Sequence, residues 1–171
     1  MGLAAAPPPP LELKAQLMQQ SASIKLTWIN PGPATLLLNV GSIAGTSGFL
    51  PNPIFYIRAA GVHDGNLVYT AGQSVMEGKL EPWVVCLPAK TEFAVSFDLR
   101  QLILPGYQKT LAEIQGQPYH LSISFIGRPA FHSGPTPDHV IPYNTTAEYG
   151  ADFPFWTGLV KAEIVNTPHL P

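Results

Sequence analysis

Residues 23–41, SIKLTWINPGPATLLLNVG, decide the expected fold of this chain. In the first part, Ile24, Leu26 and Trp28 alternate with polar neighbours, which is typical of a strand with one apolar face. The NPGP segment then stops the strand, because its prolines remove backbone donors and its glycine permits turn conformations. A second apolar run follows at 34–40. The stretch predicts two strands, joined by either a β-hairpin or a corner between two sheets.

Runs of the same kind recur along the rest of the chain. The clearest are 92–99 and 119–126, in which aromatic or aliphatic residues hold every second position. Residues 107–115 carry an apolar pair at helical spacing, which predicts a helical turn. Residues 42–53 and 127–154 lack such alternation and are rich in turn-forming residues, so we expect loops there. Further strands are expected at 11–18, 54–60, 66–70, 83–87, 102–104 and 159–165.

Length and composition narrow the fold class. A chain of 171 residues suits one domain, and its charged fraction of 12% is about half of the ~25% typical of globular domains. The 19 prolines and 15 glycines favour short strands and many turns over long helices. We therefore expect an all-β fold, an immunoglobulin-like antiparallel β-sandwich with long loops, with a small barrel as the alternative. The single sandwich domain would comprise residues 11–171 and follow a Pro-rich arm at residues 1–10.

The N-terminal sequence MGLAAAPPPP predicts export. It has no basic region and its apolar run is too short for an intact signal peptide. An Ala-rich stretch before four prolines matches the remainder of a trimmed leader followed by a stiff spacer. We therefore expect a secreted or periplasmic protein. Asn144-Thr145-Thr146 fits the pattern of a glycosylation acceptor, which applies only in a eukaryotic source.

Charge and cysteine content argue against several classes of partner and site. The formal net charge of −2 gives no reason to expect nucleic acid or an anionic membrane as a partner. No apolar run approaches the ~18 residues of a membrane span. Cys86 is the single cysteine, so it cannot form a disulfide within the chain. Because the run at 83–87 is continuously apolar, we expect a strand buried on both faces, with Cys86 as a small core residue rather than a nucleophile.

The residue types that carry catalysis or bind metals show no diagnostic spacing. His63-Asp64 and Asp138-His139 both fall in expected loops and could share a metal, but neither belongs to a zinc-binding motif. The chain has no G-x-S-x-G motif and no glycine-rich phosphate loop. We predict no catalytic residue, no metal and no cofactor. A glycosidase pair among the 11 carboxylates stays open, because the sequence does not reveal which carboxylates face each other.

Aromatic residues gather in and beside the expected loops, and they are the candidates for binding. Aromatics flanked by proline suit a surface that binds a protein or a glycan, and the alternative is that they form satellite core beneath the loops. Trp156 is the strongest candidate, because aromatic anchors dominate interface energies; its alternative role is to cap the core. The candidate binding residues are Trp156, Phe131, Tyr143, Tyr149 and Phe155.

The order of these features resembles a known kind of exported domain. The first strand, the N-P-G turn, the LLLNVG run and the later FYIR run at 55–58 resemble the immunoglobulin-like propeptide domains that precede deuterolysin-type secreted metalloproteases. The W-x-G turn at 156–158 is similar to the ending of immunoglobulin-like accessory domains of exported bacterial proteins. The chain lacks the zinc-binding helix and the cysteines of those proteases. The resemblance therefore implies an accessory or inhibitory module without protease activity.

Two hypotheses of function follow. The first is a non-enzymatic exported binding or accessory module that contacts another protein through its loops, or self-associates through weakly charged edge strands. The alternative is a carbohydrate-binding module or a glycoside-acting β-sandwich domain. A concave face with exposed aromatics and two facing carboxylates would favour this alternative.

Overall fold

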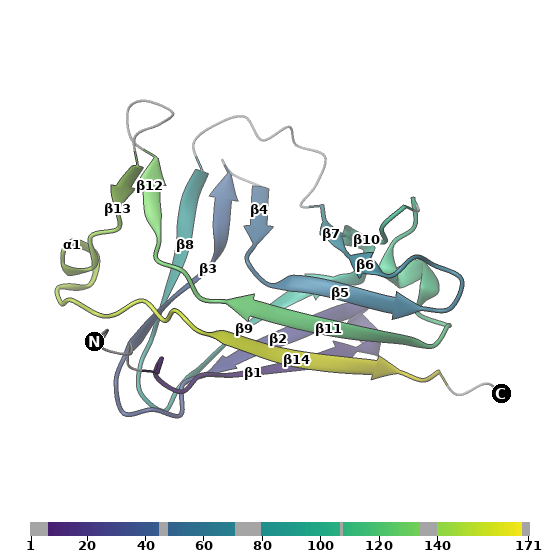
Figure 1. Cartoon of the computed structure of the whole chain (residues 1–171), viewed down its shortest axis with the longest axis horizontal. Coiled ribbons are helices and arrows are strands. Elements are labelled where there is room, and N and C mark those ends of the chain that lie inside the picture. Colours follow the sequence, from purple (N-terminus) through teal and green to yellow (C-terminus); the bar gives the residue numbers. More distant parts are fainter. Residues whose placement is uncertain (1–6, 45–47, 71–79, 107, 134–139, 169–171) are drawn as a thin grey trace, which may run out of the picture.

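The chain folds into antiparallel β-sheets that form a sandwich (Figure 1). The computed structural model describes residues 7–44, 48–70, 80–106, 108–133 and 140–168. One layer is the three-stranded sheet β1-β2-β9, and the other is the four-stranded sheet β14-β11-β5-β6. The strands of these layers are β1 Glu12–Met18, β2 Ser23–Ile29, β9 Glu92–Asp98, β14 Leu159–Asn166, β11 Tyr119–Ile126, β5 Ile54–Ala59 and β6 Gly65–Asn66.

Aromatic side chains join the two layers at the centre of the sandwich. Trp28 of β2 meets Phe125 of β11 edge to face, with ring centroids 5.5 Å apart. Phe97 of β9 meets Phe55 of β5 in the same manner at 5.2 Å. These four residues are at most 2% exposed and belong to one hydrophobic core cluster. Alternation along each strand directs them inward. The structure thus confirms the all-β sandwich, and its immunoglobulin-like topology stays a prediction.

The segment after β2 forms a corner between two sheets rather than a hairpin. β3 follows this corner and belongs to a third sheet with the order β4-β3-β8. The strands of this sheet are β3 Leu36–Ala44, β4 Gly48–Pro51 and β8 Leu80–Leu87. The return from β8 to β9 crosses between the same two sheets, because β8 pairs with β3 and β9 pairs with β2. Of the two connections that the sequence predicts, the corner is the one that forms.

The side chain of Asn30 holds this corner together. It is buried, and its Nδ2 donates to the carbonyl oxygens of Ala34 and Leu87 at 2.8 and 3.1 Å. Its Oδ1 accepts from the backbone N–H of Gly32 at 3.0 Å. The backbone N–H of Asn30 also donates to the carbonyl of Thr91, in the connection between β8 and β9. One buried residue thus satisfies backbone groups of both connections, which an apolar side chain could not do.

The segment 42–53, expected as a loop, instead completes a pair of strands. β3 continues to Ala44, and β4 folds back on it. The expectation is wrong because its turn-forming residues lie in paired strands, with Ser42 in β3 and Gly48 and Pro51 in β4. Gly41, just before the segment, also lies inside β3. A Cβ at this position would lie 2.4 Å from the carbonyl oxygen of Leu50 and 2.5 Å from the Phe49 ring. Glycine here permits close packing, which sequence patterns do not distinguish from a turn signal.

The prediction of a strand buried on both faces at 83–87 is wrong. Leu87 is buried, but the side chains from Glu81 to Cys86 are only half-buried. β8 is one of the two edge strands of its sheet, so one flank of the strand has no paired strand beside it and its side chains are covered only in part. Cys86 is therefore a partly buried residue rather than a full member of the core, and burial raises the pKa of its thiol.

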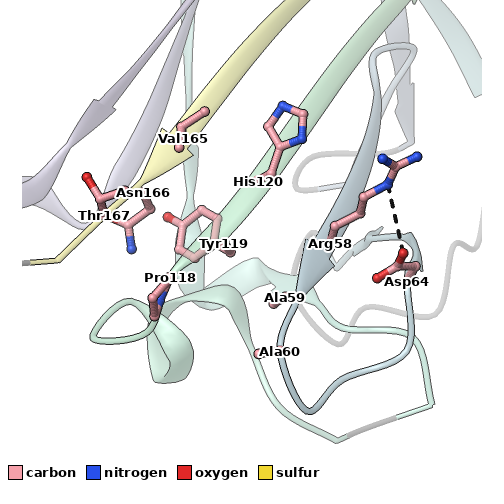
Figure 2. Close-up of a pocket in the computed structure, with 10 residues that line it drawn as sticks. All are labelled: Arg58, Ala59, Ala60, Asp64, Pro118, Tyr119, His120, Val165, Asn166 and Thr167. Atoms are coloured by element: carbon pink, nitrogen blue, oxygen red, sulfur yellow. Dashed lines mark ion pairs between the residues drawn. The ribbon is translucent and has the colours of Figure 1, made fainter.

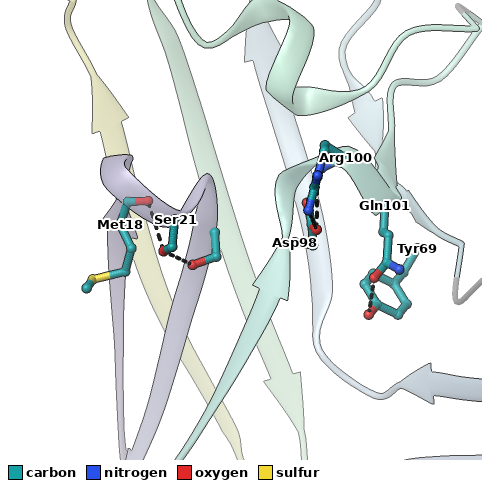
Figure 3. Close-up of polar contacts among 7 residues, drawn as sticks. Met18, Ser21, Tyr69, Asp98, Arg100 and Gln101 are labelled. Atoms are coloured by element: carbon teal, nitrogen blue, oxygen red, sulfur yellow. Dashed lines mark hydrogen bonds and ion pairs between the residues drawn. The ribbon is translucent and has the colours of Figure 1, made fainter.

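Short 3₁₀ turns follow the strands β1 and β9 (Figure 3). Asp98, the last residue of β9, caps the 3₁₀ turn η2 (Leu99–Gln101) by accepting from the Arg100 backbone N–H at 2.8 Å. Side-chain hydrogen bonds from Arg100 lower the pKa of the Asp98 carboxyl. Beside this turn, the Tyr69 hydroxyl donates to Oε1 of Gln101 at 2.7 Å. These contacts fix the ends of β9 and of the short strand that carries Tyr69.

The helical turn expected within 107–115 is the 3₁₀ turn η3, where Thr110 and Glu113 form a capping box. None of the helices in the described ranges has the length and apolar character needed to cross a membrane. The turn η3 comprises Leu111–Ile114. The remaining short elements of this part of the fold are η1 Gln19–Ser21 and the paired strands β7 Val68–Tyr69 and β10 Leu102–Ile103.

Candidate functional site

The segment 127–154, expected as a loop without regular structure, contains two strands and a helix. β12 (Phe131–Ser133) pairs with β13 (Val140–Pro142), and α1 (Thr145–Tyr149) follows. Oδ1 of Asn144 caps this helix by accepting from the Ala147 N–H at 3.1 Å. The expectation is wrong because strands of three residues and a helix of five are too short to show a period. The local signals that were available are the capping Asn and the Gly that ends the helix.

Three of the candidate binding residues meet at one end of the molecule. Tyr143 stacks on His132 with ring centroids 5.0 Å apart, and it contacts Phe155 edge to face at 6.0 Å. Tyr149 of α1 lies 6.5 Å from Tyr143. We call His132, Tyr143, Tyr149 and Phe155 the aromatic cluster. All four of its members are half-buried, so each keeps part of its surface in solvent. Phe131 precedes His132 on β12 and is 49% exposed.

Polar contacts attach the aromatic cluster to β8. Nδ1 of His132 lies 3.0 Å from Oε2 of Glu81, and the Tyr149 hydroxyl donates to the carbonyl of Val84 at 3.3 Å. Burial is the main cause that raises the pKa of the Tyr143 phenol, and the hydrogen bond with Tyr149 raises it further. Tyr143 is therefore neutral at physiological pH. The cluster is a supported surface rather than a set of free loop side chains.

Sequence patterns do not reveal the contact between His132 and Glu81. The two residues are 51 positions apart and belong to strands of different sheets. Glu81 precedes an apolar run and looks like a solvated residue when seen alone. The only available signal was the position of His132 next to Phe131, in a segment already selected for its aromatic residues.

Trp156 lies apart from the aromatic cluster and inside the core. Its side chain is 3% exposed and stacks on Phe125 with ring centroids 5.8 Å apart. Its indole Nε1 donates to the carbonyl of Pro9 at 2.7 Å. Its backbone N–H donates to the carbonyl of Leu37 at 2.9 Å, which fixes the segment beside β3. Of the two roles open from the sequence, this position favours the core role.

Two glycines shape the place of Trp156: Gly158, which the sequence indicates only as the end of a W-x-G turn, and Gly127, which sequence reasoning missed. A Cβ on Gly127 would lie 2.1 Å from the carbonyl oxygen of Trp156 and 2.4 Å from its ring. A Cβ on Gly158 would lie 2.4 Å from the other side of the same ring system. The N–H of Gly127 also donates to the carbonyl of Gly158 at 2.9 Å. Both positions therefore need glycine so that the indole can approach the backbone closely.

Gly127→Ala is expected to lower the free energy of unfolding by about 2–3 kcal/mol, because the added methyl group overlaps the backbone and ring of Trp156. Gly116→Ala is the matched control, since a Cβ there meets no atom within 4 Å. We expect the control to change the free energy by less than about 0.5 kcal/mol. Urea denaturation of both variants measures the difference. Equal stabilities would show that Trp156 can move away at little cost.

An open pocket where β11 begins is a second candidate site (Figure 2). Its volume is about 400 Å³, and residues of β5, β11 and β14 line it. Arg58 and Asp64 form an exposed ion pair at 3.8 Å on its rim. Nε2 of His120 lies 3.3 Å from Oε2 of Glu163 on the neighbouring strand. The lining of the pocket is mainly apolar, and the polar side chains Arg58, Asp64 and His120 beside it already have partners within the protein.

The described residues contain no group of three or more His, Cys, Asp or Glu side chains that could hold a metal ion. Asp64, one of the loop residues considered as a ligand, pairs with Arg58. Asp138 and His139 lie outside the described residues.

No protein-family model, curated protein or solved structure matches this chain. The likeness to metalloprotease propeptide domains therefore stays an expectation drawn from short motifs. Function is inferred from the aromatic cluster, Phe131 and the pocket themselves.

Proposed function

We propose that this chain is a non-enzymatic module that binds another protein through the aromatic cluster and Phe131. The observation that carries the proposal is the grouping of four ring side chains, three of them candidates from the sequence, beside an exposed phenylalanine. Tyrosine and phenylalanine are enriched at protein interfaces, and tyrosine is common among the few residues that carry most of the binding energy. An accessory or inhibitory role, as the resemblance implies, is the form of binding that we favour.

The anchoring of the aromatic cluster supports this proposal. Binding costs less entropy when the contacting side chains are already ordered. Here the Tyr149 hydroxyl is bonded to Val84, the Tyr143 ring is stacked on His132, and the Thr145 hydroxyl of α1 donates to Asp152 at 2.8 Å. Tyr and Phe also have only two side-chain torsions, so little freedom is lost when they are covered. The aromatic cluster can therefore contact a partner without a rearrangement of its own side chains.

The contact between His132 and Glu81 suits the edge of such an interface. The two side chains are 36% and 46% exposed, so both remain in contact with solvent while the rings beside them present apolar surface. Apolar centres surrounded by polar, partly solvated groups are the usual arrangement of protein interfaces.

We also propose that the protein acts after export, which the Ala- and Pro-rich N-terminal sequence supports. Self-association through the same surface is the variant in which the partner is a second copy.

Glycan binding at the pocket of Figure 2 is the second candidate function. The observation that favours it is the collection of polar side chains, among them Arg58, His120 and Asn166, around an open hollow on a sheet. Tyr56, on the same sheet, lies with its ring 5.8 Å from the Arg58 guanidinium carbon. Against it, the amide of Asn166 already donates to two backbone carbonyls, and Arg58 and His120 have carboxylate partners. We therefore rank it below protein binding.

Phe131→Ala is expected to weaken partner binding by about 30-fold, which corresponds to the ~2 kcal/mol of an aromatic anchor. Its effect on the free energy of unfolding should stay near 0.5 kcal/mol, because half of the ring is already in solvent. The test compares immobilised wild type and variant in retaining a partner from a periplasmic extract or culture supernatant of the source organism. The Kd for the retained protein is then measured.

Val68→Ala is the matched control for this experiment. Val68 is 59% exposed on β7, outside the aromatic cluster and the pocket of Figure 2, so its loss should leave binding unchanged. Equal retention by wild type and Phe131→Ala would show that the aromatic cluster is not the interface. Binding to a glycan library, with NMR shifts at Arg58 and His120 and none at Tyr143, would favour the second candidate instead.

A further inference from the structure

The polyproline arm contacts the folded domain at Trp156. The described part of the arm, residues 7–10, precedes β1, yet the carbonyl of Pro9 accepts from the indole Nε1 of Trp156, 147 positions later in the chain. The Pro10 ring lies nearby at Gly32, where a Cβ would be 3.6 Å from its Cγ. These two contacts involve residues that one peptide bond joins. Pro9 and Pro10 therefore contact the domain, although residues 7–10 stay exposed to solvent.

We propose that Trp156, together with the backbone at Gly32, forms a binding site for extended proline-rich segments, which the chain's own arm occupies. This inference rests on residues other than the aromatic cluster and Phe131, and it is independent of the function proposed above. The ligand class is a segment of consecutive prolines in the polyproline II conformation. The arm is the occupant seen in the structure, and a proline-rich segment of a partner protein is the ligand that would replace it.

The geometry of Trp156 suits this ligand class. An indole N–H can only donate, and a proline residue offers only its carbonyl, so the two groups are complementary. Consecutive prolines hold the extended conformation in advance, and the residue before each proline is confined to it as well. Proline-rich segments are recognised in this way by aromatic-lined grooves, where the preformed conformation limits the entropy lost on binding.

The Trp156 side chain is also built in, which separates this site from an incidental contact. The ring stacks on Phe125 at an interplanar angle of 14°, and Gly127 and Gly158 leave room for it against the backbone. Its N–H is thereby held in a fixed direction. If the arm leaves, that N–H loses its protein acceptor, and water must take the place of the Pro9 carbonyl. A proline carbonyl from another segment restores the bond, whereas a segment without prolines would first have to be ordered in the extended conformation.

The covalent link gives the arm an advantage over any free ligand. A tethered segment acts at an effective concentration of the order of millimolar, so a free proline-rich segment must exceed this advantage to enter. The arm consequently acts as a plug that sets a threshold for binding in trans. Weakening the arm should expose the site to ligand, while the sheets remain as they are.

The experiment uses the full chain in which the arm prolines are replaced, P7G/P8S/P9G/P10S, because these substitutions remove the preformed conformation and leave β1 intact. The probe is the capped peptide Ac-Ala-Pro-Pro-Pro-Pro-Leu-NH2, and the control is the same peptide with alanine in place of proline. The readout is the indole N–H resonance of Trp156, assigned with Trp156→Phe among the three tryptophans. We expect the substitutions to shift this resonance and the proline peptide to return it towards the wild-type position.

Wild type should need at least about ten-fold more peptide than the substituted chain for half saturation, because its own arm competes. Trp156→Phe keeps an aromatic ring but has no side-chain N–H, so in a background with the substituted arm the proline peptide should leave the backbone amide resonances of Gly32 and Gly127 unmoved. A resonance of Trp156 that the arm substitutions leave unmoved would overturn the proposal. So would a folded substituted chain that fails to respond to the peptide, or that responds equally to the alanine control.

Discussion

Trp156→Ala is expected to lower the free energy of unfolding by about 3–5 kcal/mol, the range measured for truncation of large buried aromatics. The side chain is 3% exposed, stacks on Phe125 and donates to the carbonyl of Pro9, so the substitution removes packing and a hydrogen bond together. The cavity cannot be filled from Gly127 or Gly158, which have no side chains. Thermal denaturation followed by circular dichroism should show a fall in Tm of roughly 6–20 °C.

Trp156→Phe separates the contributions to this effect. Phenylalanine keeps an aromatic ring against Phe125 but loses the N–H that reaches Pro9. We expect it to lose about 1–2 kcal/mol, which leaves the protein folded for binding assays. The outcome that would contradict the core role is a Trp156→Ala variant that keeps its stability to within about 1 kcal/mol and loses partner binding. Trp156 would then be a surface anchor, the other role open from the sequence.

The strands with strict alternation are the part of the fold that the sequence predicts well. In β11, the residues expected to point inward, Tyr119, Leu121, Ile123 and Phe125, are all buried. β2 behaves in the same way. The period of two is imposed locally by the pleat, so the pattern carries its own information. The pattern does not indicate that the hydroxyl of Tyr119 is buried as well, and this burial raises the pKa of the hydroxyl to about 12.

Other parts of the fold depend on neighbours that a sequence pattern does not reveal. Gly41 is of a residue type that is common in turns, but here it lets Leu50 and Phe49 of the neighbouring strand approach the backbone closely. The run that ends at Leu87 has the composition of a buried strand but lies at a sheet edge. In both cases the local pattern is the same in either environment, and the pairing of distant strands decides between them.

The candidate site divides in the same way. Phe131, Tyr143, Tyr149 and Phe155 could be selected from the sequence because aromatics in a proline-rich segment are too apolar for a disordered linker. The sequence does not reveal which of these rings meet. Their positions depend on β8, which lies outside the segment, and on His132, which no sequence pattern singles out. The contact of Trp156 with Pro9 spans nearly the whole chain and has no sequence signature.

Asn30→Ala is expected to lower the free energy of unfolding by about 2–4 kcal/mol, because it leaves several buried backbone groups without partners. The Asn30 side chain donates to the carbonyls of Ala34 and Leu87 and accepts from the Gly32 N–H, and it is fully buried. Alanine satisfies none of these groups, and the Asn30 side chain that does so has no exposed surface. Urea denaturation, with the slope compared to wild type, measures the loss.

Asn39→Ala is the matched control for the corner, because it removes the same amide from the adjoining strand β3. Its Nδ2 donates only a long, exposed hydrogen bond to Pro129 at 3.3 Å, and its Oδ1 has no partner among the described residues. We expect a change within about 0.5 kcal/mol, since removing an unsatisfied buried oxygen offsets the loss of a weak bond. If both variants lose equal stability, the corner does not depend on Asn30. The prolines at 31 and 33 would then set the change of direction alone, by restricting the backbone on either side of Gly32.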